Sequence, residues 1–313
     1  MSNPLAGKDL LSTQTLSREA IELIIAQAST FEAQCQEKRK LDVLEGYILA
    51  TLFYEPSTRT RLSFETAMHR LGGDVISVAE ATKSSSAKKG ETIADATRVI
   101  AGYADVIVQR HPRPYSAEEA AEGATVPVIN AGDGSHEHPT QALLDLYTIA
   151  KERGQIDSLR IALVGDLRYG RTVHSLAYAL ANFDVQLTLV SPPALKMSAQ
   201  IVDEVRSDIP VIESDDLASA LERCDVAYVT RIQKERFDDP ADYEALKASY
   251  QIDRSLVKRT NPEATLMHPL PRVNEIAPEV DQLPNAAYFR QATNGVWARM
   301  AILALVLGAK VEG

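Results

Sequence analysis

Short apolar runs rich in β-branched residues alternate along the chain with longer segments whose apolar residues recur about every 3.6 positions. One such helical stripe consists of Ile21, Ile24, Ile25 and Ala28. Strands that alternate with helices predict parallel sheets with helices on both faces. The predicted strands are Tyr47–Phe53, Val75–Val78, Asp105–Gln109, Pro127–Asn130, Arg160–Val164, Val185–Val190, Val211–Ile212, Asp225–Thr230 and Thr265–Met267.

Two helix starts can be placed from local signals. Pro139 suits the first turn of a helix, where its missing N–H group has no partner to lose. The helical stripe that follows it consists of Ala142, Leu143, Leu146 and Ile149. Ser116 and Glu119 have the spacing of a capping box, which predicts that Ser116 caps another helix.

A polar stretch, Lys151–Ser158, interrupts the alternation near the middle of the chain. We place a domain boundary there, which gives two doubly wound α/β domains, residues 1–150 and 151–313. The C-terminal helix, at about residues 291–307, could also pack back on the first domain. In such folds ligands bind beyond the carboxyl ends of the strands, so the loops after the strands should carry the functional residues.

The composition excludes several classes of protein. The chain has 313 residues, of which 45% are hydrophobic and 24% charged, as in ordinary globular proteins. Its net charge of -10 argues against general nucleic-acid binding. No apolar run is long enough to span a bilayer, and the N-terminus lacks the pattern of a signal peptide. Cys35 and Cys224 are far apart and lack metal-ligand spacing, so we expect a cytoplasmic protein.

The loop after the first predicted strand leads into a helix and carries Ser57, Thr58, Arg59 and Thr60. A helix N-terminus offers free N–H groups and a positive dipole end, so these hydroxyls and the guanidinium predict a phosphate site. A plain Ser/Thr cap with solvated arginines is the simpler alternative. Three hydroxyls interleaved with two arginines argue against it. Arg61 is expected to point away and to form a structural ion pair.

Two further loops of the first domain carry candidate ligand-binding residues. Arg110 emerges from a buried strand, which is favourable only where the guanidinium meets an anion. Residues 132–141 run from the next strand into a helix and place His138 and Gln141 where they can bond a ligand carbonyl or amide. His136 and His138 also form an H-x-H pair, but no third ligand accompanies them, so no metal is expected.

The usual nucleotide-binding motifs are missing. The polar loop Lys83–Glu91 resembles a mobile solvated loop, and the Walker A pattern occurs neither there nor elsewhere. Gly165 begins a stretch, GDLRYGRT, that is only superficially similar to a dinucleotide fingerprint, because G-x-G-x-x-G is absent. Nor is a Ser-His-Asp nucleophile, a carboxylate pair or a cysteine–histidine pair evident. What remains is chemistry by positioning and electrostatics on small anionic substrates.

In the second half, two arginines follow predicted strands. Arg171 comes after Arg160–Val164 at a helix start, and Arg231 comes directly after Asp225–Thr230. Either arginine alone could form a surface salt bridge of little energetic weight. Together they suggest a ligand with two carboxylates, each held by a guanidinium fork. The prolines of His268–Arg272 keep the chain extended and leave carbonyl groups free to accept from an amide.

Taken in order, these loops resemble the catalytic chains of aspartate carbamoyltransferases, within the aspartate/ornithine carbamoyltransferase family. S-T-R-T-R after a strand is similar to carbamoyltransferases generally, whereas GDGSHEHPTQ, GDLRYGRTVHS, TRIQKER and HPLPR resemble the aspartate branch. The resemblance covers essentially the whole chain. The ornithine branch would be expected to carry a cysteine in H-C-L-P, where this chain has Pro269.

The resemblance implies two α/β domains with the active site between them, the first binding carbamoyl phosphate and the second binding aspartate. Catalytic roles fall on Thr60, Arg110 and His138. Carbamoyl phosphate would be bound by these three together with Ser57, Thr58, Arg59, Ser85, Gln141, Leu270 and Pro271. Aspartate would be bound by Lys89, Arg171, Arg231 and Gln233. Ser85 and Lys89 would enter from a neighbouring subunit of a homotrimer, and separate regulatory chains are a further partner that the resemblance suggests.

The implied reaction is transfer of a carbamoyl group from carbamoyl phosphate to L-aspartate, the committed step of de novo pyrimidine biosynthesis. It requires no metal or organic cofactor. Two alternatives stay open: a carbamoyltransferase for another amine such as ornithine, and a non-catalytic paralogue. Two guanidinium groups would repel the side-chain cation of ornithine. A non-catalytic paralogue would be expected to have lost Arg59, Lys89, His138 or Arg231, and all four are present.

Overall fold

The computed structural model describes residues 3–37, 40–81, 90–232 and 250–309. The chain divides into two compact units. Unit 1 comprises Met1–Tyr147 and Thr293–Gly313, and unit 2 comprises Thr148–Ala292. Each unit contains one parallel sheet with helices, which confirms the predicted fold class. Among the described residues, no helix has the length and apolar character needed to cross a membrane.

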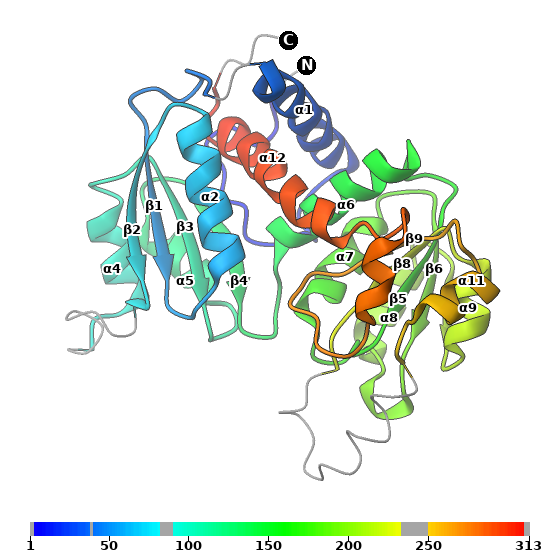
Figure 1. The fold of residues 1–313 in the computed structure, drawn as a ribbon. Coiled ribbons are helices and arrows are strands. Elements are labelled where there is room, and N and C mark those ends of the chain that lie inside the picture. Colours follow the sequence, from blue (N-terminus) through cyan, green and yellow to red (C-terminus); the bar gives the residue numbers. More distant parts are fainter. Residues whose placement is uncertain (1–2, 38–39, 82–89, 233–249, 310–313) are drawn as a thin grey trace. The chain divides into compact units, whose positions relative to one another are not determined.

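Unit 1 is built on a parallel four-stranded sheet in the order β2-β1-β3-β4 (Figure 1). Its strands are β1 (Ile48–Phe53), β2 (Asp74–Ala79), β3 (Val106–His111) and β4 (Val128–Asp133). Its helices are α1 (Arg18–Glu37), α2 (Thr58–Arg70), α4 (Ile93–Ile100), α5 (Ser116–Gly123), the beginning of α6 (Pro139–Arg153) and most of α12 (Tyr288–Val306). Figure 1 shows α2 on one side of this sheet and α4 and α5 on the other.

The four strands of unit 1 differ sharply in burial. β4 is buried throughout, and β1 and β3 are nearly so, as expected for parallel strands covered on both faces. The edge strand β2 is different, because most of its residues are exposed. Ile76 is 41% exposed and Val78 is 38% exposed. This strand therefore leaves apolar side chains uncovered at the edge of the sheet.

Unit 2 contains a parallel five-stranded sheet in the order β7-β6-β5-β8-β9 (Figure 1). Its strands are β5 (Arg160–Val164), β6 (Gln186–Val190), β7 (Val211–Ser214), β8 (Val226–Val229) and β9 (Thr265–Met267). Its helical segments are α7 (Arg171–Leu180), η2 (Pro193–Leu195), α8 (Ala199–Arg206), α9 (Leu217–Arg223), α11 (Arg254–Arg259), η4 (Pro278–Gln282), the end of α6 and the start of α12. The central strands supply its core.

Each predicted strand is present, with ends that move by up to three residues. β4 continues to Asp133 because its pairing with β3 resumes at His111 after a register shift. The predicted cap at Ser116 is wrong, since Ser116 is already the first helical residue of α5 and Tyr115 takes the cap position. Tyr115 has a left-handed backbone conformation with a φ of 58°, and its N–H donates to Asp133 Oδ2 at 2.8 Å. That bond fixes where the helix begins.

Candidate functional site

The predicted phosphate loop forms the N-terminus of α2. Ser57 is the cap residue with extended backbone angles, and its side chain makes no capping hydrogen bond. Thr58, Arg59 and Thr60 form the first turn; Thr60 is only 6% exposed, whereas Thr58 and Arg59 are exposed. Hydroxyls therefore surround a helix start whose N–H groups and dipole favour an anion, as predicted from the sequence.

Arg61 takes no part in the predicted anion site. Its Nη1 lies 3.4 Å from Glu65 Oε1, one helical turn onward, and 3.3 Å from Ser77 Oγ on β2. Glu65 also accepts from Ser77 at 2.7 Å. The prediction that Arg61 forms a structural ion pair is confirmed.

Arg110 lies beside the phosphate loop at the same end of the sheet. It is paired with Phe53 across β1 and β3, and its carbonyl accepts from the N–H of Tyr54 at 2.8 Å. Its guanidinium contacts Glu55, with Nε at 2.7 Å and Nη2 at 2.6 Å from the same oxygen. The partner of this strand-end arginine is therefore a carboxylate of the phosphate loop itself, a contact that we did not predict.

His138 and Gln141 come from the third strand end of this edge, after β4. His138 is 4% exposed and immediately precedes α6, and its Nδ1 lies 3.5 Å from Thr140 Oγ1. Gln141 is half-buried in the first turn, where its Nε2 donates to Asp145 Oδ1 at 2.9 Å. β1, β3 and β4 are consecutive neighbours in the sheet. The phosphate loop, Arg110 and His138 of unit 1 therefore lie together at the carboxyl ends of these three strands.

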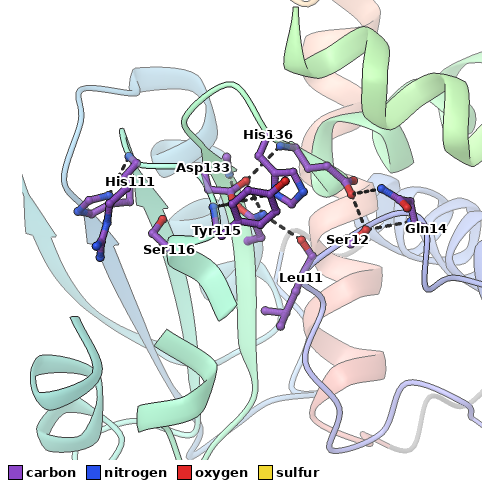
Figure 2. Close-up of polar contacts among 12 residues, drawn as sticks. Leu11, Ser12, Gln14, His111, Tyr115, Ser116, Asp133 and His136 are labelled. Carbon is purple, nitrogen blue, oxygen red and sulfur yellow. Dashed lines mark hydrogen bonds and ion pairs between the residues drawn. The ribbon is translucent and has the colours of Figure 1, made fainter. Parts of the chain in front are cut away.

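Asp133 organises the loop between β4 and α6, which carries His138 (Figure 2). Its Oδ1 accepts from Asn130 Nδ2 at 2.9 Å and from the N–H of Glu137 at 3.1 Å. Its Oδ2 accepts from the N–H of Tyr115 and lies 3.0 Å from His136 Nδ1. Burial lowers the pKa of His136, but the hydrogen bond to Asp133 and the nearby carboxylates outweigh it, and the net shift is upward.

Among the described residues, ligand atoms of Glu118, Asp133 and His136 lie within 4.8 Å of one another. Four donors already serve the Asp133 carboxylate, so the group holds the loop together by hydrogen bonds. His138 is not a member of this cluster. The two histidines of the H-x-H pair therefore lie in separate environments.

Glu137 ties this loop to the N-terminal segment of the chain, which sequence reasoning missed. Its carboxylate is 1% exposed and accepts from the Ser12 hydroxyl, from the N–H and the hydroxyl of Thr13 at 2.9 and 2.7 Å, and from Gln14 Nε2 at 3.5 Å. Figure 2 shows Ser12 and Gln14 directed toward the loop beside His136. These donors hold the buried carboxylate of Glu137 in place, and Glu137 directly precedes His138.

Unit 2 brings the two predicted aspartate-binding arginines to neighbouring strand ends. Arg171 begins α7 after β5, and Arg231 follows β8, which pairs with β5. Gly165 has a φ of +117°, and a Cβ placed there would lie 2.5 Å from the carbonyl oxygen of Thr230. Only glycine allows this close approach of the two loops. The buried Asp166 braces the first loop through its Oδ1, which accepts from two backbone N–H groups at 3.2 and 3.0 Å.

The loop after β9 presents Leu270 and Pro271 and is braced by His268. The Nδ1 of His268 accepts from the N–H of Leu270 at 2.7 Å, and its Nε2 lies 2.7 Å from Glu275 Oε1. Burial raises the pKa of Glu275, but the bonds from His268 and from backbone N–H groups outweigh it, and the net shift is downward. A pocket here is lined by Gly165, Val229, Thr230, Ile232, Tyr250, Asn274 and Glu275.

Three predicted site residues, Ser85, Lys89 and Gln233, lie outside the described residues. The other predicted site residues of unit 1 lie at the carboxyl ends of β1, β3 and β4. The other predicted site residues of unit 2 lie on the loops after β5, β8 and β9. Glu55, Glu137, Asp145 and Glu275 are the polar partners that sequence reasoning missed. No short motif marks Glu55 or Glu137, because their partners lie far away in the chain. Asp145 and Glu275 have partners only four and seven residues away, and a pair at such a spacing does not by itself indicate a contact at a site.

Fold and site together define a chain with two α/β units, of which the first carries hydroxyls and an arginine at a helix N-terminus and the second carries two arginines at neighbouring strand ends. The chain belongs to the aspartate/ornithine carbamoyltransferase family. The model of the carbamoyl-P binding domain of that family matches residues 8–151, and the model of its Asp/Orn binding domain matches residues 157–306.

Within this family the chain is similar to proteins named for aspartate. It is 55% identical to the aspartate carbamoyltransferase catalytic subunit of Thermococcus kodakarensis over 96% of this chain and 97% of that protein. A solved structure of the catalytic subunit of M. jannaschii aspartate transcarbamoylase has a TM-score of 0.91 at 52% identity, covering 96% of this chain and 98% of that chain. Aspartate transcarbamoylase from Trypanosoma cruzi in complex with N-(phosphonacetyl)-L-aspartic acid has a TM-score of 0.93 at 42% identity, covering 98% of both chains.

Proposed function

We propose that this chain is an aspartate carbamoyltransferase, which transfers the carbamoyl group of carbamoyl phosphate to the amine of L-aspartate. The products are N-carbamoyl-L-aspartate and phosphate, in the committed step of de novo pyrimidine biosynthesis. The choice of aspartate rests on the pair Arg171 and Arg231. Their loops approach each other closely at Gly165 and Thr230. Two guanidinium groups suit a substrate with two carboxylates.

Carbamoyl phosphate would bind in unit 1 through its phosphate. Ser57, Thr58, Arg59 and Thr60 surround the N-terminus of α2, where N–H groups and hydroxyls can donate to phosphate oxygens. Ser85 would add a further donor from a neighbouring subunit. Charge-assisted hydrogen bonds of this kind contribute roughly 1.5–3 kcal/mol each, so a few of them account for selective binding of a small dianion.

The carbonyl oxygen of the carbamoyl group would face Thr60, Arg110 and His138. When the neutral aspartate amine attacks the carbonyl carbon, negative charge develops on this oxygen, and preorganised donors stabilise it. The bond from carbon to the phosphate oxygen then breaks, and the departing phosphate takes the proton that the amine loses. Arg110 contacts Glu55 in this structure, so binding of the substrate requires it to share or exchange that partner.

The NH2 of the carbamoyl group needs acceptors. Gln141 and the backbone carbonyls of Leu270 and Pro271 would supply them, the latter two from the loop that His268 and Glu275 brace. Aspartate would be held by Arg171, Arg231, Lys89 and Gln233. Placing both substrates in attack geometry can remove about 7–11 kcal/mol from the barrier without a covalent intermediate.

The working form would be a cytoplasmic homotrimer in which Ser85 and Lys89 enter the site of a neighbouring subunit. The exposed edge strand β2 supports this assembly, because Ile76 and Val78 leave apolar surface on the strand that leads toward those residues. Separate regulatory chains would be a further partner, since the relatives are named catalytic subunits. The reaction needs no metal or organic cofactor.

Initial rates of phosphate release test this function. L-aspartate should support turnover, whereas L-asparagine and L-ornithine should be slower by orders of magnitude, because each leaves a guanidinium without its carboxylate. Arg231→Ala should abolish most aspartate use and leave carbamoyl phosphate binding nearly intact by calorimetry. Arg223→Ala, an exposed arginine before the other end of β8, is the matched control. Equal rates with asparagine and aspartate would refute the two-carboxylate clamp.

A further inference from the structure

Gln141 and Asp145 lie one turn apart on α6 within unit 1. Asp145 has no exposed surface, and its Oδ1 accepts from Gln141 Nε2 at 2.9 Å. A side-chain amide has two ends of similar shape, of which the nitrogen donates and the oxygen accepts. A carboxylate only accepts, so the nitrogen of Gln141 must face Asp145. The oxygen of the amide is thereby left to meet a different donor.

A buried cation lies in the same core as Asp145. Arg299 of α12 is 3% exposed, donates to the carbonyl of Gly295 at 3.0 Å and lies 5.1 Å over the ring of Phe64. Burial lowers the pKa of Arg299, and attraction to Asp145 acts in the opposite direction. A cation near Asp145 favours the ionised carboxylate, which is the form that cannot donate to Gln141.

Burying Asp145 and Arg299 contributes little to the stability of the fold. Moving charged groups out of water costs several kcal/mol per ion after relaxation, and well-packed apolar residues of similar volume often do as well or better. Stability alone therefore gives little reason for a buried aspartate at this place on α6. A reason for Asp145 is that it sets the orientation of the Gln141 side-chain amide. Gln141 is the half-buried residue of the pair and lies in the first turn of the helix.

We propose that Asp145 is a positioning residue that holds the amide oxygen of Gln141 toward the NH2 of the carbamoyl group. This inference rests on the proposed function of the site. With the amide turned around, two N–H groups would face each other and repel. Asp145 thus favours substrates that present an NH2 over acyl phosphates that present a methyl group at the same point. Acetyl phosphate is the nearest such analogue and needs no acceptor there.

Calorimetry with three ligands tests the role. Asp145→Asn keeps the shape but can donate to Gln141, so the amide can turn. The affinity for carbamoyl phosphate should fall about tenfold, as expected for loss of one hydrogen bond and creation of one repulsive contact. The affinities for acetyl phosphate and for inorganic phosphate should stay within about twofold. Equal losses for all three ligands, or no loss for any, would overturn the proposal.

Gln141→Leu supplies a double-mutant cycle that a merely structural role would not satisfy. Because Asp145 acts through Gln141, adding Asp145→Asn to Gln141→Leu should cause no further loss of carbamoyl phosphate affinity. Full additivity of the two losses would contradict the inference. Should Asp145→Asn fail to fold, Asp145→Ser makes the same comparison, since its hydroxyl can donate or accept. If neither folds, Asp145 serves stability and the proposal is wrong.

The failure of the proposed function would look different. In that case the wild-type chain itself would not bind carbamoyl phosphate or would not carbamoylate aspartate. A wild-type chain that is active, together with Gln141→Leu that binds all three ligands normally, would instead show that Gln141 does not contact the carbamoyl group.

Discussion

At the scale of single residues, the two histidines before α6 have different surroundings although one residue separates them. His136 bonds to Asp133, and its ring centroid lies 4.0 Å from that of Tyr115 (Figure 2). His138 is 4% exposed at the start of the helix. The first histidine holds the loop together, whereas the second is placed where a ligand can reach a helix N-terminus. Their substitution should therefore have different effects.

His138→Ala should fold normally and lower kcat by about 10²–10³, the usual loss for one oxyanion donor. Steady-state rates with saturating substrates measure this effect. His136→Ala is the matched control, and its kcat should stay within a few fold of the wild type. An unchanged kcat in His138→Ala, or a loss that added zinc restores, would refute the assigned role.

Glu137→Ala should destabilise the chain by about 1–3 kcal/mol, because the N–H and hydroxyl of the fully buried Thr13 lose their acceptor. Urea unfolding measures the change. Glu119→Ala is the control, since its ion pair with Arg113 is exposed and such pairs contribute less than about 1 kcal/mol. If the two variants were equally stable, the contact with the N-terminal segment would have no energetic importance.

At the scale of elements, the two sheets place functional loops in the same way but differ at one edge. In both, loops after neighbouring parallel strands carry the residues predicted to bind anions. β2 and β7 are the edge strands that expose an isoleucine, with Ile76 at 41% and Ile212 at 48%. β2 directly precedes, in the chain, the residues proposed to reach a neighbouring subunit, whereas β7 lies in unit 2, far from them in the sequence. The two strands thus form a matched pair for testing the interface.

Ile76→Lys should convert the proposed trimer to monomers, because a buried unpaired ammonium costs several kcal/mol. Activity should fall with it, since Ser85 and Lys89 would no longer reach a neighbour. Ile212→Lys should remain trimeric and active. Sedimentation velocity, together with rates of phosphate release, distinguishes the two variants. A trimeric, active Ile76→Lys protein would place the subunit interface elsewhere.

At the scale of the whole molecule, the sequence predicts what local patterns encode and misses what long-range contacts create. The helix starts at Ser57 and Arg171 are predictable, because a cap or loop signal precedes apolar periodicity. Glu137 carries no such signal, since its donors lie more than 120 residues away in the chain. The cap predicted at Ser116 failed for the same reason, since a bond from Tyr115 to the distant Asp133 sets that helix start.

Sharing of sites between subunits predicts that inactive variants complement each other. Separate trimers of Lys89→Ala and of His138→Ala should both be nearly inactive. After dissociation and joint reassembly, some interfaces in mixed trimers pair a wild-type Lys89 with a wild-type His138. Activity should then rise well above the sum of the parents. No recovery, despite hybrids seen by native mass spectrometry, would show that each chain completes its own site.

The proposed reaction forms a bond between the carbamoyl carbon and the aspartate nitrogen. Carbon-13-labelled carbamoyl phosphate and nitrogen-15-labelled L-aspartate, incubated with the purified chain, test it directly by carbon NMR. A product resonance split by coupling between the two labels, growing in step with phosphate release, is the predicted result. Phosphate release with the carbon label in bicarbonate and no such coupling would mean that the chain only hydrolyses carbamoyl phosphate, contrary to the proposed transfer.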